Sequence, residues 1–113
     1  MKIKICVVGL GYVGLPLAIE FAKVFDTVGF DVNKKKVTEL KKGIDRMNET
    51  PSSILKKTKL KFTTDEKEIS NCNFIVVAVP TPIDEAFKPD LKYVRSASEI
   101  VGKNLSKGSI IVY

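Results

Sequence analysis

The stretch Gly9-Leu10-Gly11-Tyr12-Val13-Gly14 decides how this chain folds. It follows a β-branched run of strand length, Ile3 to Val8, and opens an apolar segment with helical spacing, Tyr12 to Phe25. In this segment one face, Ala18, Phe21, Ala22 and Phe25, is expected to be buried. A strand, a glycine-rich turn and a helix in this order are typical of a dinucleotide-binding site. The first glycine permits the tight turn, the second lets a pyrophosphate approach the backbone, and the third lets the helix pack closely on the sheet.

The start of the predicted helix is the expected phosphate site. Its free N–H groups and the positive end of its dipole favour an anion, and Tyr12 and Val13 lie where those N–H groups begin. Their backbones are the expected donors, whereas their side chains are expected to pack. The alternative is a tight glycine turn that holds no ligand, because plain turns use the same pattern.

Asp31 is the expected contact to the adenosine ribose. It closes a second predicted strand, Thr27 to Phe30, twenty-two residues after Gly9. A carboxylate there accepts hydrogen bonds from the ribose hydroxyls of NAD and repels the 2′-phosphate of NADP. The alternative is a solvent-exposed aspartate at a strand end. Lys36, one turn into the next helix, is expected to reach the adenosine side, while its neighbours Lys34 and Lys35 are expected to face solvent.

The remaining elements follow in alternation. A helix is predicted from Asn33 as N-cap to Lys42, with Gly43 directly after its end and Ile44 on its apolar spacing. Further helices are predicted from Thr50 as N-cap, with Pro51 as first helical residue, to Lys57, from Asp65 for a turn or two, and from Leu91 to Leu105. Strands are predicted at Leu60–Thr63, Phe74–Val79 and Ser109–Tyr113. Phe74–Val79 is apolar without alternation, as a strand buried on both faces would be. This pattern predicts an α/β fold, a Rossmann-type doubly wound parallel sheet with strand order 3-2-1-4-5, truncated after the fifth strand.

The order of such a sheet reverses between its first and fourth strands, and a ligand crevice opens there. Thr81, in Val79-Pro-Thr-Pro82, follows the fourth strand at this point. Its hydroxyl and backbone are candidates for contact with the nicotinamide half of the cofactor. Spacing alone leaves equally open a threonine that merely caps a proline-bounded turn.

Composition excludes several kinds of chemistry. The chain has 113 residues, two cysteines and no histidine, so neither a usual zinc site nor a Ser-His or Cys-His nucleophile pair can be built. Cys6 and Cys72 are expected to be unbridged, because a register aligned on the strand ends separates them by about 16 Å, whereas a disulfide needs Cα atoms within about 7 Å.

Charge and hydropathy limit the partners. The formal net charge is +6, but the lysines are scattered in short groups, so a solvated face is favoured over a nucleic-acid interface. No apolar run approaches membrane-spanning length, and the first residues lack the layout of a signal peptide. The expectation is a cytoplasmic protein with no nucleic-acid or membrane partner.

Three segments resemble the UDP-glucose/GDP-mannose dehydrogenase family. They are Lys4–Ala18, Val28–Asn33 and Val79-Pro-Thr-Pro82, which occur in the family's order, and the resemblance extends over the whole chain. The loop Gly43–Thr50 is similar to the branch that oxidises UDP-N-acetylhexosamines.

The resemblance implies a nucleotide-sugar 6-dehydrogenase that oxidises a sugar C6 alcohol to the uronate with NAD, for capsule or O-antigen polysaccharides. It assigns NAD contacts to Val13, Asp31, Lys36 and Thr81. The family's catalytic cysteine, its assisting lysine and asparagine, and a Glu-Ser-Thr motif lie beyond Tyr113. Residues 1–113 are therefore expected to be the NAD-binding domain of a longer multidomain protein that is homo-oligomeric, and to bind cofactor without catalysis.

Three alternatives stay open. The first is a free-standing dinucleotide-binding module that senses or regulates. The second is a domain of a β-hydroxyacid-type dehydrogenase, which shares the glycine turn. The third is a methyltransferase, which the third glycine disfavours because its cofactor has no pyrophosphate.

Overall fold

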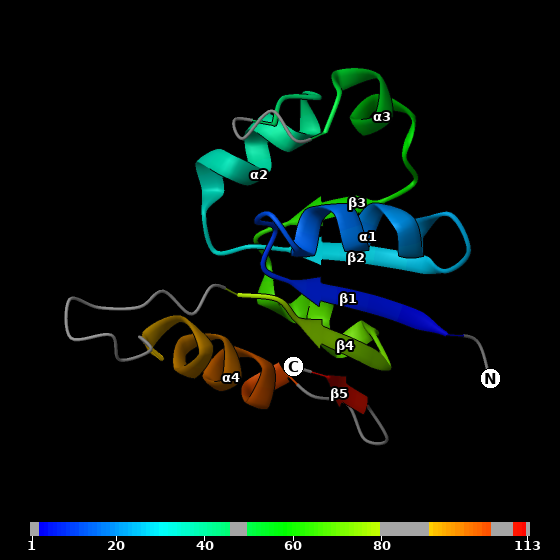
Figure 1. Cartoon of the computed structure of the whole chain (residues 1–113). Coiled ribbons are helices and arrows are strands. Elements are labelled where there is room, and N and C mark those ends of the chain that lie inside the picture. The colour runs from blue at the N-terminus through cyan, green and yellow to red at the C-terminus, as the bar shows by residue number, and fades with distance from the viewer. Residues whose placement is uncertain (1–2, 46–49, 80–90, 105–109, 113) are drawn as a thin grey trace.

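A sheet of five parallel strands forms the centre of the computed structural model (Figure 1), which describes residues 3–45, 50–79, 91–104 and 110–112. The strand order is β3-β2-β1-β4-β5, as predicted. The strands are β1 (Lys4–Val8), β2 (Asp26–Phe30), β3 (Lys61–Thr63), β4 (Phe74–Val77) and β5 (Ile110–Val112). The helices are α1 (Gly14–Ala22), α2 (Lys34–Lys41), α3 (Ser52–Lys57), the 3-10 helix η1 (Glu66–Asn71) and α4 (Lys92–Asn104).

The register of β1 aligns the ends of the three central strands. Val8, the last residue of β1, lies opposite Phe30 of β2 and Val77 of β4. Because these strands are parallel, their carboxyl ends meet at one edge of the sheet, on the left in Figure 1. The glycine turn, the start of α2 and the chain that follows β4 all leave from this edge.

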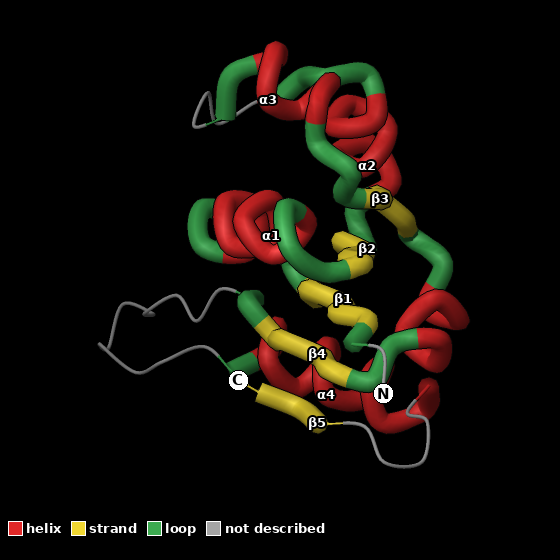
Figure 2. The backbone as a smooth tube through the Cα atoms, turned by 90° about the vertical axis from the view of Figure 1, so that its right-hand side faces the viewer, coloured by secondary structure: helices red, strands yellow, loops and turns green. Residues whose placement is uncertain are grey.

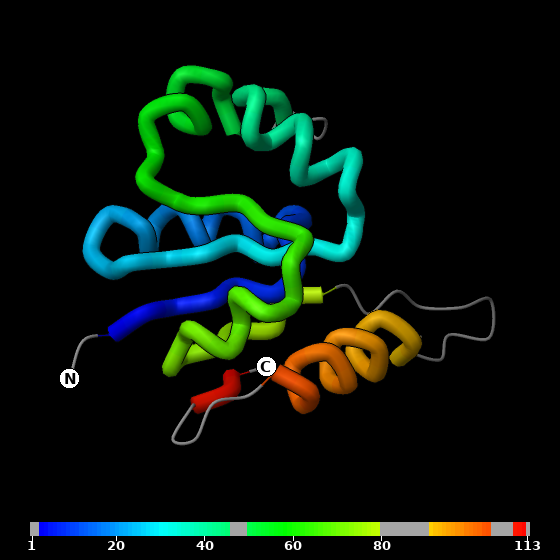
Figure 3. Tube along the Cα trace, turned by 180° about the vertical axis from the view of Figure 1, so that it is seen from behind, coloured from blue at the N-terminus to red at the C-terminus, as the bar shows by residue number. Residues whose placement is uncertain are grey.

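The two faces of the sheet carry separate cores. Ile5 and Val7 of β1 pack on the side of α1, whereas Cys6 and Val8 pack on the side of η1 and α4. Figures 2 and 3 show α1 on one side of the sheet and η1 with α4 on the other. The alternation follows from the two-residue period of a strand that is buried on both faces.

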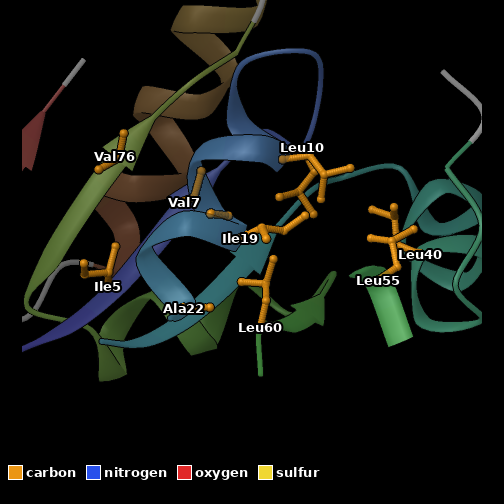
Figure 4. Packing of buried hydrophobic residues seen from close by; sticks show 11 residues of the cluster. Ile5, Val7, Leu10, Ile19, Ala22, Leu40, Leu55, Leu60 and Val76 are labelled. Carbon is orange, nitrogen blue, oxygen red and sulfur yellow. The ribbon is translucent and has the colours of Figure 1, made fainter. Parts of the chain in front are cut away.

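The core on the α1 side extends beyond the sheet to α2 and α3. Figure 4 shows Leu10 and Ile19 beside Val7, and Leu40 of α2 close to Leu55 of α3. Leu10 and Val7 are both fully buried, although Leu10 belongs to the glycine turn. The turn is therefore anchored in the core by its own side chain, which restricts its geometry.

Helix α1 is shorter than the segment Tyr12–Phe25 that the sequence predicts. Its first helical residue is Gly14, because the turn continues through Val13. It ends at Ala22, where the N–H of Lys23 turns back to the carbonyls of Glu20 and Phe21. Its buried residues are Gly14, Leu15, Ala18, Ile19 and Ala22, so the expected burial of Phe25 is wrong, and this side chain is 36% exposed.

The ends of α2 match the prediction. Asn33 caps the helix, and its side chain accepts a hydrogen bond from the N–H of Lys36 at 3.0 Å. Gly43 has φ of 85°, and the N–H groups of Gly43 and Ile44 bond the carbonyls of Leu40 and Glu39, which is a Schellman motif. Ile44 is consequently directed outward and is 50% exposed, contrary to the helical spacing.

Two further local predictions need correction. Pro51 is the N-cap of α3 and not its first helical residue, because its ψ of 146° is extended and its carbonyl accepts from Ile54 and Leu55. The cysteines are unbridged, but the predicted offset of five residues is too long, since Cys6 lies opposite Ile75, three residues after Cys72. Cys72 is the C-cap of η1, its backbone is extended toward β4, and its side chain belongs to the core on the η1 side.

Gly14 provides a test of the packing between α1 and the glycine turn. A Cβ at this position would collide with the carbonyl oxygen of Gly9 and lie 2.9 Å from its carbonyl carbon. Both are backbone atoms, so Gly14→Ala should lower the free energy of unfolding by about 3 kcal/mol. The measurement is urea unfolding followed by circular dichroism.

Gly102→Ala is the matched control for this substitution. Gly102 lies in α4, where an added Cβ meets nothing within 4 Å. Alanine should stabilise this helix by about 0.5–1 kcal/mol, because glycine loses more backbone entropy on folding. Equal effects of the two substitutions would contradict the close contact between α1 and Gly9.

Candidate functional site

A cavity of about 650 Å³ opens at the carboxyl edge of the sheet. Its walls are the glycine turn, the end of β2 with the start of α2, the end of β4, and the first half of α4. The cavity therefore lies at the switch point between β1 and β4. This is where the strand order predicts a ligand crevice.

The glycine turn brings backbone to the floor of this cavity. Gly9 has φ of 101°, and its N–H donates to the carbonyl of Phe30 at 2.8 Å. A Cβ on Gly9 would lie 2.8 Å from the carbonyl oxygen of Ala78, so the turn needs glycine for both conformation and space. Gly11 differs, because a Cβ there would meet nothing within 4 Å and would enter the cavity that Gly11 lines.

Three N–H groups at the start of α1 are available to a ligand. Among the described residues, those of Gly11, Tyr12 and Val13 donate no hydrogen bond, whereas the carbonyl of Gly11 already accepts from Leu15 at 3.1 Å. The first turn of α1 contains no acidic residue. The site therefore combines unused donors with the positive end of the helix dipole, which favours an anion.

Tyr12 and Val13 both line the cavity, but their side chains do not pack as predicted. The side chain of Tyr12 is 66% exposed and that of Val13 is 69% exposed. The turn lifts these residues away from the sheet before α1 begins at Gly14. Their expected role as backbone donors is consistent with this geometry.

Asp31 lies at the cavity wall and holds two turns together. Its Oδ2 accepts from the N–H of Leu10 at 2.9 Å, and its Oδ1 accepts from the N–H of Asn33 at 3.0 Å. The carboxylate thus links the glycine turn to the turn between β2 and α2, a role that the sequence analysis missed. Each carboxylate oxygen has further lone pairs, so the half-buried group retains acceptor capacity toward the cavity.

The lysines at the start of α2 differ in exposure. Lys36 is half-buried and lines the cavity, whereas Lys34 and Lys35 are exposed. Lys36 and Lys35 also line a smaller cavity of about 80 Å³ between α2 and Leu10. Lys36 is thus the cation of this group that borders both spaces.

Helix α4 supplies cavity residues that the sequence analysis missed. Tyr93, Ser96, Ala97 and Ile100 line the wall opposite the end of β2. The sequence analysis treated this helix only as a packing element, and Ala97 and Val101 are indeed buried. The available signal was the position of Tyr93, one turn before Ala97 on a helix that follows the switch-point strand. Its side chain is 47% exposed, as expected of a cavity wall.

Gly14 does not line the cavity. Gly14 is buried behind the turn and contacts Gly9, which agrees with its predicted packing role. Thr81 lies outside the described residues. Residues 3–45, 50–79, 91–104 and 110–112 contain no group of three or more side chains suited to a metal ion, and no helix among them is long and apolar enough to cross a membrane.

Comparison with known proteins places the chain in a family. Residues 3–113 match the model of the UDP-glucose/GDP-mannose dehydrogenase family, NAD binding domain. The chain is 50% identical to a UDP-N-acetyl-D-glucosamine 6-dehydrogenase of Salmonella typhi, over 99% of this chain and 27% of that protein. It is 45% identical to Protein CapL of Staphylococcus aureus, over 100% of this chain and 27% of that protein.

A solved structure agrees with this placement. The structure of a UDP-D-ManNAc dehydrogenase from Pyrococcus horikoshii superposes with a TM-score of 0.88 at 31% identity, over 96% of this chain and 27% of that chain. The chain thus spans about a quarter of the length of these relatives. On the match of residues 3–113, it belongs to the UDP-glucose/GDP-mannose dehydrogenase family, within the part described as the NAD binding domain.

Proposed function

We propose that residues 1–113 are the NAD-binding domain of a nucleotide-sugar 6-dehydrogenase. The observation that carries the proposal is the cavity in which Gly11, the unused N–H groups of Tyr12 and Val13, and the carboxylate of Asp31 meet. One end of this arrangement favours a phosphate and the other accepts from hydroxyl groups. A dinucleotide presents both groups, joined by a pyrophosphate.

The proposed binding mode assigns a task to each site residue. Gly9 and Gly14 shape the turn, and Gly11 leaves room for the pyrophosphate beside the N–H groups of Tyr12 and Val13. Asp31 accepts from the adenosine ribose, and Lys36 lies on the adenosine side. Thr81 stays a prediction for the nicotinamide side, on the resemblance alone. When bound, NAD supplies the hydride acceptor, while this chain orients it.

The proposed substrate of the whole protein is a UDP-N-acetylhexosamine, whose C6 alcohol is oxidised to the uronate. Support comes from relatives named UDP-N-acetyl-D-glucosamine 6-dehydrogenase, at 50% and 49% identity, and UDP-N-acetyl-D-mannosamine dehydrogenase, at 37% identity. A role in capsule or O-antigen synthesis follows from the same proposal.

The proposal gives this chain no catalytic group. It has no histidine, and both cysteines are buried in the core away from the cavity. The nucleophile would therefore come from another part of a longer protein. A cytoplasmic location agrees with two unbridged cysteines, since reducing compartments keep thiols reduced. Homo-oligomerisation of the full-length protein stays a prediction.

Gly11→Val tests whether the pyrophosphate lies against the glycine turn. The added methyl groups would occupy the open space beside Gly11 without meeting protein atoms at the Cβ. The variant should keep its unfolding midpoint and bind NAD at least about a hundredfold more weakly, at 1.4 kcal/mol per decade. The measurement is isothermal titration with NAD.

Gly102→Val is the control, because Gly102 also has no neighbour within 4 Å of an added Cβ but lies outside the cavity. It should bind NAD as the unsubstituted chain does. An unchanged affinity of Gly11→Val would place the phosphates elsewhere.

Asp31→Ala tests cofactor selectivity. Hydrogen bonds to a charged group contribute about 1.5–3 kcal/mol, so the substitution should weaken NAD binding about ten- to a hundredfold. Removing the carboxylate also ends its repulsion of a 2′-phosphate and frees the N–H groups of Leu10 and Asn33. Loss of these two contacts affects both cofactors alike, so the ratio of the NADP and NAD dissociation constants is the informative quantity. This ratio should fall.

The control for selectivity is Asp26→Ala, at the opposite end of β2, where the residue is exposed. All constants are measured at one salt concentration, because net charge biases anion binding. The prediction fails if the unsubstituted chain binds NADP as tightly as NAD, or if Asp31→Ala leaves the ratio unchanged.

The isolated chain should bind NAD without oxidising a sugar. Reduction of NAD is followed by absorbance with UDP-N-acetylglucosamine, UDP-N-acetylmannosamine and UDP-glucose as substrates. No formation of NADH above the substrate-free rate is expected. Sustained turnover by the purified chain would show that it contains its own catalytic groups.

A further inference from the structure

The surplus positive charge of this chain lies in one segment. Residues 34–61 contain ten lysines and arginines but only three aspartates and glutamates, so their net charge exceeds the +6 of the whole chain. In the sequence these lysines occur in short, separate groups, which favours a solvated face. The fold brings several of the groups together.

Helices α2 and α3 pack on each other at the end of the molecule that is remote from α4 (Figures 1 and 3). Leu40 of α2 and Leu55 of α3 are buried in the same core. A Cβ on Gly43, two residues after α2, would lie 3.0 Å from Cγ and Cε of Lys56 in α3. The last turns of the two helices, which both contain lysine, are therefore close to each other.

The exposed side chains around this junction, continued by those that lead into β3, form what we call the lysine surface. Besides lysines it contains two isoleucines, Ile44 and Ile54, which are 50% and 44% exposed. The lysine surface consists of Lys41, Lys42, Ile44, Ile54, Lys56, Lys57, Lys59 and Lys61, all of which are exposed.

The charges of the lysine surface are not neutralised within the described part of the chain. No ion pair between described residues includes one of its lysines. Glu39 and Asp45, the acidic residues described in the same segment, are half-buried. The lysines therefore present a positive field to solvent, which attracts an anionic partner.

We propose that the lysine surface docks this protein on a membrane that contains anionic phospholipids. Clusters of four to eight lysines or arginines bind anionic headgroups, and exposed aliphatic side chains enter the boundary between headgroups and acyl chains. On α3, Ile54 and Lys57 are three positions apart and share one face of the helix, whereas Leu55 points into the core. Such docking is peripheral and needs no membrane-spanning segment.

The composition of this surface fits a lipid better than a nucleic acid. Residues 34–61 contain no aromatic side chain, and lysine is the only cation among those described. Proteins that bind single strands stack bases on aromatic residues, and bidentate arginine is the commonest specific contact to duplex bases. Exposed isoleucines contribute nothing to contact with a phosphate backbone, but they add apolar area that a bilayer buries.

The lysine surface is separate from the cofactor cavity. None of its residues lines that cavity. Lys41 follows Lys34, at the cavity end of α2, by seven residues, which is about 10 Å along a helix. The docking proposal therefore does not depend on the proposed cofactor, and vesicle binding is measured without NAD.

The test is co-sedimentation of the chain with lipid vesicles. One set of vesicles is phosphatidylcholine alone, and the other is equimolar phosphatidylcholine and phosphatidylglycerol. The chain should bind the mixed vesicles and not those of phosphatidylcholine alone. Binding should weaken steadily as salt is added, because salt screens exposed charges.

Matched substitutions locate the contact. Lys57→Gln combined with Lys59→Gln should weaken binding to mixed vesicles at least about tenfold. The control, Lys67→Gln combined with Lys103→Gln, removes the same charge from exposed positions of η1 and α4 and should bind as the unsubstituted chain does. Ile54→Ser should weaken binding about fivefold, whereas Val24→Ser, at a position that is 76% exposed outside the lysine surface, should not.

Circular dichroism verifies that each variant is folded. If one is not, the comparison of the two vesicles and the salt series on the unsubstituted chain still decide. The proposal is overturned by equal binding to both vesicles, by binding to neither, or by an equal loss in the Lys67 and Lys103 control. Tighter binding to a DNA or RNA oligonucleotide than to mixed vesicles at the same salt concentration would also overturn it, in favour of a nucleic-acid partner.

Discussion

The contact between Gly9 and Gly14 is the constraint on which the rest of this structure depends. The carbonyl of Gly9 occupies the space that a Cβ on Gly14 would need, and Gly9 itself lies against the carbonyl of Ala78. The start of α1, the end of β1 and the residues after β4 therefore meet at closely packed backbone atoms. This packing requires two glycines of the motif, Gly9 and Gly14. Of the three motif glycines, only Gly11 faces open space in the cavity. The fold therefore requires Gly9 and Gly14, whereas the proposed ligand requires Gly11.

Asp31, at the end of the neighbouring strand β2, fixes the position of the glycine turn. Its two hydrogen bonds, to the N–H groups of Leu10 and Asn33, join the glycine turn to the start of α2. The side chain of Leu10 adds a second attachment, because it is fully buried and packs against Gly29 of β2. The carboxylate proposed to select the cofactor thus also shapes the surface on which the cofactor would lie. A substitution at this position would therefore change the geometry of both turns as well as the proposed selectivity.

The sequence predicts what local chemistry controls and misses what depends on tertiary contact. The strand order, the cap at Asn33 and the turn at Gly43 follow from alternation, side-chain capping and positive φ, which are short-range. The offset between Cys6 and Cys72 was mispredicted because it depends on the register of β1 against β4, which pairs Val8 with Val77. The contribution of Tyr93 to the cavity wall was missed because the sequence does not show that α4 lies beside the switch point.

The central strand β1 connects both cores of this short domain to the glycine turn. Its residues pack alternately into the two cores, Val7 on the side of α1 and Cys6 on the side of η1. The end of the strand continues into the glycine turn. A strand held by ladders on both sides has little freedom to shift. The core on the η1 side and the glycine turn are therefore both held by the same hydrogen-bonded element. A substitution of Cys6 would change the stability of this element without entering the cavity, because Cys6 is buried and does not line it.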